Sequence, residues 1–164
     1  SLRIELDSWR WAGVPFFLRT GKCLPVTATE VFVTLKRPPQ NVFAEELNGQ
    51  RNYVRFRLGP DRLSVAIGAR TKVPGETMAG NEVELYVCHQ RGDEREAYER
   101  LISDAMIGDS SLFARQDGVE ASWRVVDPIL TASTPLYPYE ASTWGPVESQ
   151  ALMASFGGWQ NPKA

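Results

Sequence analysis

The residue best suited to chemistry is Lys22, which ends the tetrapeptide RTGK after a long apolar and aromatic run. A lysine presents a compact ammonium group with three hydrogen-bond donors, which suits a phosphate or a hydroxyl-rich ligand. Gly21 before it allows an unusual backbone conformation or a close approach of a ligand to the main chain. The segment therefore indicates either a lysine positioned to bind such a ligand or a solvated lysine at a strand end.

The other chemically capable residues favour structural roles. The single histidine, His89, follows a predicted strand and is interpreted as an exposed strand-end residue. Cys23 and Cys88 lie far apart without metal-ligand spacing, and we interpret them as free thiols in a reducing compartment. The remaining bases around the first strands could converge near one sheet end, but taken singly they are interpreted as surface or salt-bridged groups: Arg19, Lys36, Arg37, Arg55 and Arg57.

Composition and missing motifs exclude several classes of function. The net charge is −2, so no basic field indicates nucleic-acid binding. There is no glycine-rich dinucleotide loop, no P-loop and no GxSxG motif. No apolar run is long enough to span a membrane, and we expect a cytoplasmic protein. The chain begins at Ser1 without a methionine, and we expect it to be an excised fragment.

Alternating apolar and polar residues predict four strands, over residues 30–35, 53–58, 63–69 and 83–88. The short segment Gly59–Arg62, which contains Pro60 and Asp61, predicts a hairpin turn between the second and third strands. Alternation of this kind indicates an antiparallel sheet with one buried, apolar face.

The second half of the chain changes to a helical period. Residues 94–107 predict an amphipathic helix that Gly108 ends. A second helix is predicted from a capping box formed by Asp117 and Glu120. Its buried face is predicted to comprise Val119, Trp123 and Val126.

Prolines and glycines delimit the rest of the helical half. Pro128 is predicted to kink or end the second helix, and Pro146 to open a last helix that reaches Phe156 and ends at Gly157–Gly158. Strands followed by helices predict an α+β fold, with a large, mainly antiparallel sheet and helices packed on one face.

Four stretches, in order and together covering most of the chain, resemble the C-terminal domain of glucose-6-phosphate dehydrogenase. They are WRWAGVPFFLRTGKCLP, TEVFVTLKRPP, AYERLISDAMIGDSSLFARQDGVEASWRVVDPIL and STWGP. The resemblance implies that residues 1–164 form the domain that contacts substrate and makes the subunit interface. The family's N-terminal Rossmann domain, which binds NADP, and its catalytic histidine are absent from these residues.

The family oxidises glucose 6-phosphate to 6-phosphogluconolactone with NADP, at the entry to the pentose phosphate pathway. The resemblance therefore implies glucose 6-phosphate as the substrate, a homo-oligomer formed through the sheet, and no activity for residues 1–164 by themselves. The alternative is a non-catalytic paralogue or a stand-alone association domain.

Within the resemblance, Lys22 matches the lysine of the family's R-T/C-G-K motif, which contacts the sugar phosphate. Thr27 stands where the family usually carries a second base, and Gly59 stands where a glutamine can contact the sugar. A threonine can hydrogen-bond a hydroxyl but brings no charge to a phosphate. The implied substrate-binding residues are Lys22 and Thr27, and no catalytic residue is implied.

Some family members bind a second, structural NADP in this domain. Arg57 and Trp159 match that site, but three positions that need a base carry Phe32, Ile67 and Trp144. We therefore expect no cofactor in these residues.

Overall fold

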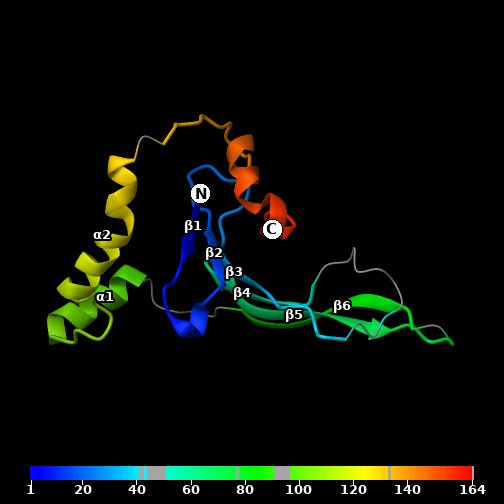
Figure 1. Cartoon of the computed structure of the whole chain (residues 1–164). Helices are drawn as coiled ribbons and strands as arrows, with labels where there is room; N and C mark the ends of the chain where they lie inside the picture. The colour runs from blue at the N-terminus through cyan, green and yellow to red at the C-terminus, as the bar shows by residue number, and fades with distance from the viewer. Residues whose placement is uncertain (41–42, 44–50, 77, 91–96, 133, 164) are drawn as a thin grey trace. The chain divides into compact units, whose positions relative to one another are not determined.

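The computed structural model describes residues 1–40, 43, 51–76, 78–90, 97–132 and 134–163 (Figure 1). The chain divides into two units. The sheet unit comprises Ser1–Arg91 and Tyr139–Ala164, and the helical unit comprises Gly92–Pro138.

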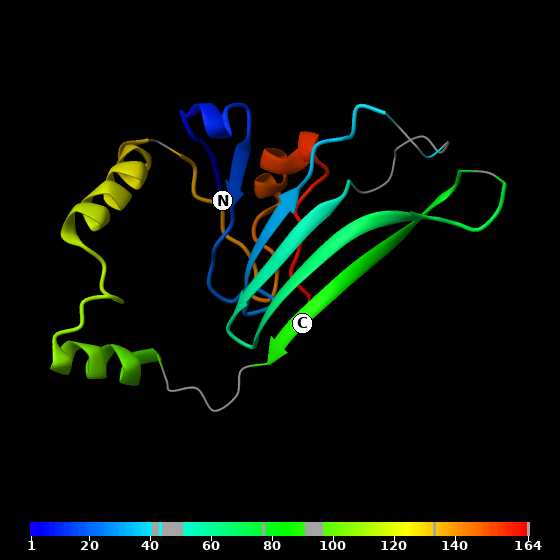
Figure 2. The same ribbon diagram turned by 90° about the horizontal axis from the view of Figure 1, so that it is seen from below.

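Among its described residues, the sheet unit holds six strands in two antiparallel sheets. The larger sheet has the order β3 (Thr29–Thr34), β4 (Tyr53–Gly59), β5 (Arg62–Lys72) and β6 (Gly80–Gln90), so each strand pairs with the next in sequence (Figure 2). All four predicted strands are confirmed, as is the hairpin between β4 and β5. The smaller sheet, of β1 (Leu2–Glu5) and β2 (Pro15–Leu18), was not predicted. With the helices described below, this confirms the α+β class.

The strand register gathers the apolar residues on one face of the larger sheet, which we call the apolar sheet face. Its members form two rows across the strands, Val31–Phe56–Val65–Val87 and Val33–Val54–Ile67–Leu85. The expectation that this face is buried is wrong for the chain by itself. Six of the eight side chains have exposed fractions between 41% and 75%. Alternation predicts which residues share a face, but it does not predict what covers that face.

The buried residues of the sheet lie on the opposite face. Ala66 has an exposed fraction of 1% and Arg57 of 4%. Phe32 stacks on Tyr53 with ring centroids 4.6 Å apart. A Cβ at Gly68 would overlap the ring of Tyr53. Glycine at position 68 therefore allows Tyr53 to lie flat on the strand beside it.

The C-terminal segment packs within the sheet unit. Helix η2 (Val147–Phe156) follows Pro146, which caps it rather than occupying its first position. Gly157 and Gly158, with φ of +90° and +82°, end the helix as predicted. The ring of Phe156 lies 4.9 Å from that of Phe17, so η2 packs against β2. A short helix, η1 (Trp9–Trp11), links β1 and β2.

The helical unit holds α1 (Ala97–Ile107) and α2 (Gln116–Thr131). The predicted start of the first helix at Glu94 lies outside the described residues, and its end before Gly108, where φ is +77°, is confirmed. The predicted capping box is wrong, because Arg115 is the N-cap and Asp117 already lies in the first turn. Pro128 lies inside α2, which continues to Thr131.

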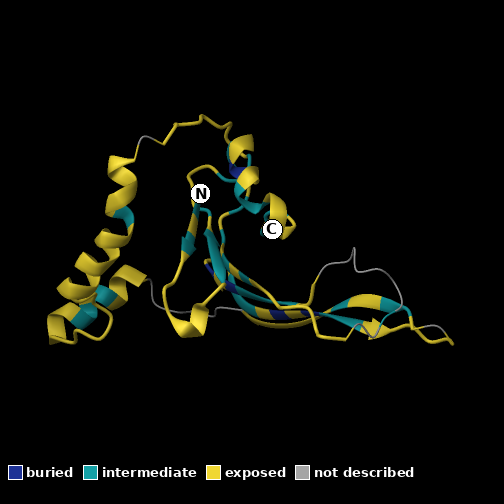
Figure 3. Ribbon diagram, viewed as in Figure 1, coloured by how far each residue is buried: buried dark blue, intermediate teal, exposed yellow. Residues whose placement is uncertain are grey.

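Neither α1 nor α2 has a buried residue (Figure 3). The expectation that Val119 and Trp123 are buried is wrong, because Trp123, for example, has an exposed fraction of 56%. Val126 is half-buried. Helical periodicity predicts an apolar face, whereas burial also needs a surface that packs against it. Among the helices in the described ranges, none combines the length and apolar composition that a membrane span requires.

Candidate functional site

Lys22 lies in the segment between β2 and β3, residues 19–28, which we call the lysine loop. The side chain is exposed. Among the described residues, its ammonium group has neither a hydrogen bond nor an ion pair. All three donors are therefore available to a ligand.

The main chain of the lysine loop is held by a segment more than a hundred residues further along the sequence. The hydroxyl of Tyr139 donates to the carbonyl of Lys22 at 2.7 Å, and the amide of Ser142 donates to the carbonyl of Cys23 at 2.8 Å. Two successive carbonyls of the loop are thus fixed by one segment of the sheet unit.

The unusual backbone conformation predicted for Gly21 is found instead at Cys23, which has φ of +53°. Gly21 is not among the residues with positive φ. Its importance is spatial, because a Cβ there would lie 3.1 Å from the Tyr139 hydroxyl and 3.4 Å from Leu24 Cδ2. The close approach that glycine permits is therefore made by Tyr139.

Arg19 anchors the start of the lysine loop. Its guanidinium lies between two rings, 4.8 Å from the centroid of Trp144 and 4.7 Å from that of Trp159. Nη2 donates to Asn161 Oδ1 at 2.5 Å. Burial lowers the pKa of Arg19, because the charged form loses solvation. The enclosure between two tryptophans supports a structural role for Arg19.

Thr27 and Gly59 lie at the same end of the larger sheet. Thr27 is exposed two residues before β3 begins, and Gly59, the last residue of β4, pairs with Thr29. Gly59 is buried and has φ of +125°. Position 59 therefore offers a ligand no side chain, whereas Thr27 offers a hydroxyl.

Two of the other bases, Arg55 and Arg57, are engaged within the sheet. Arg57 donates from Nε and Nη2 to the two carboxylate oxygens of Asp61, each at 2.9 Å. Its Nη1 donates to Glu30 at 3.1 Å and to the Lys163 carbonyl at 2.7 Å. Arg55 pairs with Glu84 at 2.6 Å. The interpretation as salt-bridged groups is confirmed for Arg55 and Arg57.

The Arg57–Asp61 pair changes the acidity of both groups. The hydrogen bond to Asp61 raises the pKa of Arg57, and the same bond lowers the pKa of Asp61. Because each nitrogen of Arg57 already has an acceptor, the guanidinium is not available to an external anion.

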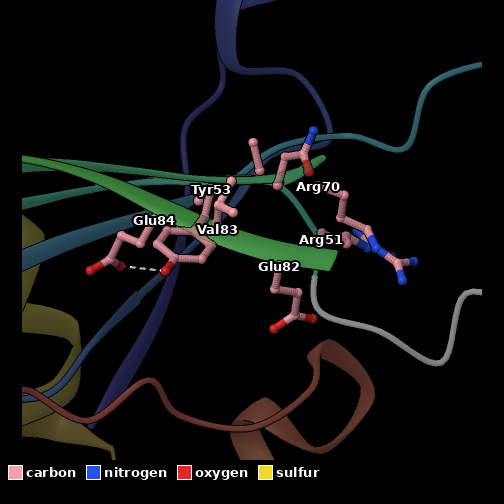
Figure 4. Close-up of a pocket in the computed structure, with 9 residues that line it drawn as sticks. Arg51, Tyr53, Arg70, Glu82, Val83 and Glu84 are labelled. Atoms are coloured by element: carbon pink, nitrogen blue, oxygen red, sulfur yellow. Dashed lines mark hydrogen bonds between the residues drawn. The ribbon is translucent and has the colours of Figure 1, made fainter. Parts of the chain in front are cut away.

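A cavity of about 170 Å³, missed by the sequence analysis, lies beside Tyr53 on the larger sheet (Figure 4). Its lining includes both acidic and basic side chains. The Tyr53 hydroxyl donates to the carboxylate of Glu84, which raises the pKa of Tyr53. Lys22 is not part of this cavity. The strand register brings opposite charges together here, because Arg70 on β5 pairs with Glu82 on β6.

The remaining predicted groups are dispersed. His89 is exposed near the end of β6, which confirms its interpretation as a strand-end residue. Cys23 and Cys88 are exposed free thiols. Within the described ranges, no group of three or more histidine, cysteine, aspartate or glutamate side chains is arranged to hold a metal ion.

Comparison with known proteins places nearly the whole chain in one family. The family model described as "Glucose-6-phosphate dehydrogenase, C-terminal domain" matches residues 1–160. The glucose-6-phosphate 1-dehydrogenase of Aggregatibacter actinomycetemcomitans is 42% identical over 170 residues, covering 99% of this chain and 34% of the relative. Glucose-6-phosphate 1-dehydrogenase 1 of Mycobacterium tuberculosis is 36% identical over 164 residues, with coverage of 99% and 34%.

Comparison with solved structures finds the same family. Glucose-6-phosphate 1-dehydrogenase from Mycobacterium avium has a TM-score of 0.83 and 37% identity, covering 99% of this chain and 35% of that protein. A glucose-6-phosphate dehydrogenase in complex with its substrate glucose-6-phosphate has a TM-score of 0.71 and 25% identity, with coverage of 98% and 34%. The chain spans about a third of the length of these relatives.

Proposed function

Because the chain belongs to the glucose-6-phosphate dehydrogenase family as its C-terminal domain, we propose that it supplies the substrate-contacting and subunit-interface part of such an enzyme. The whole enzyme oxidises glucose 6-phosphate to 6-phosphogluconolactone, in the pentose phosphate pathway. NADP accepts the hydride and is bound by the N-terminal Rossmann domain. Residues 1–164 by themselves are inactive in this proposal. Two exposed free thiols fit a reducing compartment, the cytoplasm.

Lys22 is the residue that binds the phosphate of glucose 6-phosphate. The observation that carries this role is an exposed ammonium without a partner among the described residues, on a loop whose main chain is fixed. A charge-assisted hydrogen bond to a phosphate oxygen is among the stronger polar contacts in proteins. Thr27 adds a hydroxyl for the sugar, so the positive charge that residues 1–164 bring to the site is that of Lys22.

A second, structural NADP is not part of the proposal, because the residues do not fit it. Arg57 is fully engaged by Asp61, Glu30 and the main chain. At two positions where a base is needed, Phe32 stacks on its neighbour in the sheet, and Trp144 stacks on a guanidinium.

The apolar sheet face is the surface at which a second copy of the chain packs. Its two rows of side chains form a continuous apolar surface across four strands. Contiguous exposed apolar surface of this kind marks interaction sites. The same face on both copies would produce the isologous interface of a two-fold dimer.

The experiment that tests the site is Lys22→Ala in the whole enzyme. Removing a charged hydrogen bond of about 1.5–3 kcal/mol should raise the KM for glucose 6-phosphate about 10- to 150-fold. The KM for NADP should change little. Lys36→Ala, which removes another exposed lysine, is the matched control. An unaltered KM for the sugar phosphate in Lys22→Ala, with the dimer intact, would contradict the role of Lys22 as the phosphate ligand.

A second measurement uses the thiol beside Lys22. Bound glucose 6-phosphate should slow alkylation of the exposed Cys23 by N-ethylmaleimide, while Cys88, on β6, should react at its original rate. Glucose without the phosphate should protect Cys23 much less. Equal rates at Cys23 with and without glucose 6-phosphate would contradict a binding site at the lysine loop.

A further inference from the structure

We propose that Tyr139 is a positioning residue for Lys22, and that it acts through the main chain of the lysine loop. Its hydroxyl donates at 2.7 Å to the carbonyl of Lys22, the very residue whose side chain carries the charge. The two residues are 117 positions apart in sequence. This inference rests on the proposed role of Lys22 as the phosphate ligand.

The loop conformation at this point needs an external restraint. Cys23 adopts a left-handed backbone conformation, φ +53°, which is unfavourable for a residue with a side chain. Such a conformation persists where surrounding contacts hold it. The contacts here are the bonds from Tyr139 to the Lys22 carbonyl and from the Ser142 amide to the Cys23 carbonyl. Together they restrain the peptide units on both sides of the Cys23 Cα, the first of which begins at Lys22.

A fixed main chain lowers the cost of binding. A loop that moves freely must be ordered when its ammonium group meets a phosphate, and that ordering reduces affinity. With the Lys22 carbonyl restrained, only the side chain remains to be ordered. Tyr139 therefore contributes to affinity for the sugar phosphate without touching it.

The absence of a side chain at Gly21 leaves room for the Tyr139 hydroxyl. A Cβ at position 21 would lie 3.1 Å from Tyr139 Oη, so that one of the two groups would have to shift by a few tenths of an ångström. The glycine of the RTGK tetrapeptide is therefore explained by the space that the tyrosine hydroxyl needs. Residues 21 and 139 should be coupled energetically.

The first test removes a single oxygen atom, in Tyr139→Phe of the whole enzyme. Losing one hydrogen bond should raise the KM for glucose 6-phosphate about three- to tenfold, with kcat and the KM for NADP close to wild type. Tyr137→Phe is the matched control, because the Tyr137 hydroxyl has no partner among the described residues. A KM in Tyr139→Phe equal to that of this control would overturn the inference.

A double-mutant cycle with Lys22→Ala separates positioning from a general loss of structure. If Tyr139 acts through Lys22, Tyr139→Phe should have no further effect on KM once the lysine is gone. Full additivity of the two effects would overturn the inference while leaving the proposed function intact. If Lys22→Ala itself leaves KM unchanged, the proposed function fails, so the two failures are distinguishable.

The third test uses the steric coupling. Gly21→Ala should raise the KM in the wild-type background and raise it less in the Tyr139→Phe background, because phenylalanine lacks the atom that the new Cβ would meet. The same rise in both backgrounds would show that the contact between residues 21 and 139 is not the cause.

Discussion

Replacing Ile67 with aspartate should separate the two subunits that we propose to meet at the apolar sheet face. Ile67 lies on the inner strand β5, opposite Val54 and Leu85, and has an exposed fraction of 45%. Fully burying an isoleucine contributes about 1.5–3 kcal/mol, so the part still exposed contributes about 1 kcal/mol. In a two-fold dimer this contribution is made twice, because each copy buries its own Ile67 at the interface.

The introduced charge adds a larger penalty. A carboxylate placed among apolar side chains without a partner costs at least about 1–3 kcal/mol at each copy. The sum over two copies is about 4 kcal/mol or more, which corresponds to a rise of roughly 1,000-fold in the dimer Kd. The folded subunit should tolerate the change, because Ile67 is half-exposed before association.

The assay is sedimentation equilibrium over nanomolar to high micromolar concentrations, with circular dichroism to confirm folding. The unmodified chain should be a dimer at micromolar concentration, and Ile67→Asp should be a monomer. Leu85→Asp tests the same row at the exposed strand β6. Cys88→Asp is the matched control, because Cys88 lies on β6 with its side chain on the opposite face.

Two results would refute the reasoning. One is an unmodified chain that stays monomeric at micromolar concentration. The other is an Ile67→Asp variant that dimerises with the original Kd. If Cys88→Asp separates the subunits and Ile67→Asp does not, the copies meet at the opposite face.

Two further predictions concern stability. Asp61→Asn should lower the Tm at neutral pH. Arg57 holds the pKa of Asp61 below its usual 3.8, so the stabilisation from this pair is present above about pH 4 and is lost as the pH falls through the lowered pKa. The difference in Tm between the wild type and Asp61→Asn should therefore disappear in acid. A Tm difference that does not depend on pH would contradict this. Gly68→Ala should destabilise the chain by about 1–3 kcal/mol in urea unfolding, since the new Cβ overlaps the Tyr53 ring. A neutral or stabilising result would show that the ring moves aside without cost.

The period-two pattern was sufficient to locate β3 to β6, because alternation follows directly from the geometry of an extended chain. It was not sufficient to predict burial. Val87 belongs to the predicted apolar face, yet its exposed fraction is 75%, since burial depends on what packs against the strand. The strand β1 carries the same signal, because Leu2 and Ile4 are apolar and Arg3 and Glu5 are polar, but the prediction did not use it.

The site was predictable as far as its chemistry is local. A glycine followed by a lysine singled out Lys22 from residue types in one short stretch. Its partner Tyr139 could not be found this way, because their contact joins residues 117 apart and has no periodic signature. The role of Gly21 was predicted in kind, as a close approach, but the approaching group is a tyrosine of the same chain.

The division of the sheet unit into two stretches of sequence has a consequence for synthesis on the ribosome. The contacts from Arg57 to Lys163, Lys22 to Tyr139 and Arg19 to Asn161 join residues 106, 117 and 142 positions apart. None of these contacts can form until its later partner, Tyr139, Asn161 or Lys163, has emerged from the ribosome. Folding of the sheet unit is therefore completed after translation of residues 92–138, and contacts of such long range form slowly. During that interval the nascent β-strands remain open to contact with other polypeptides.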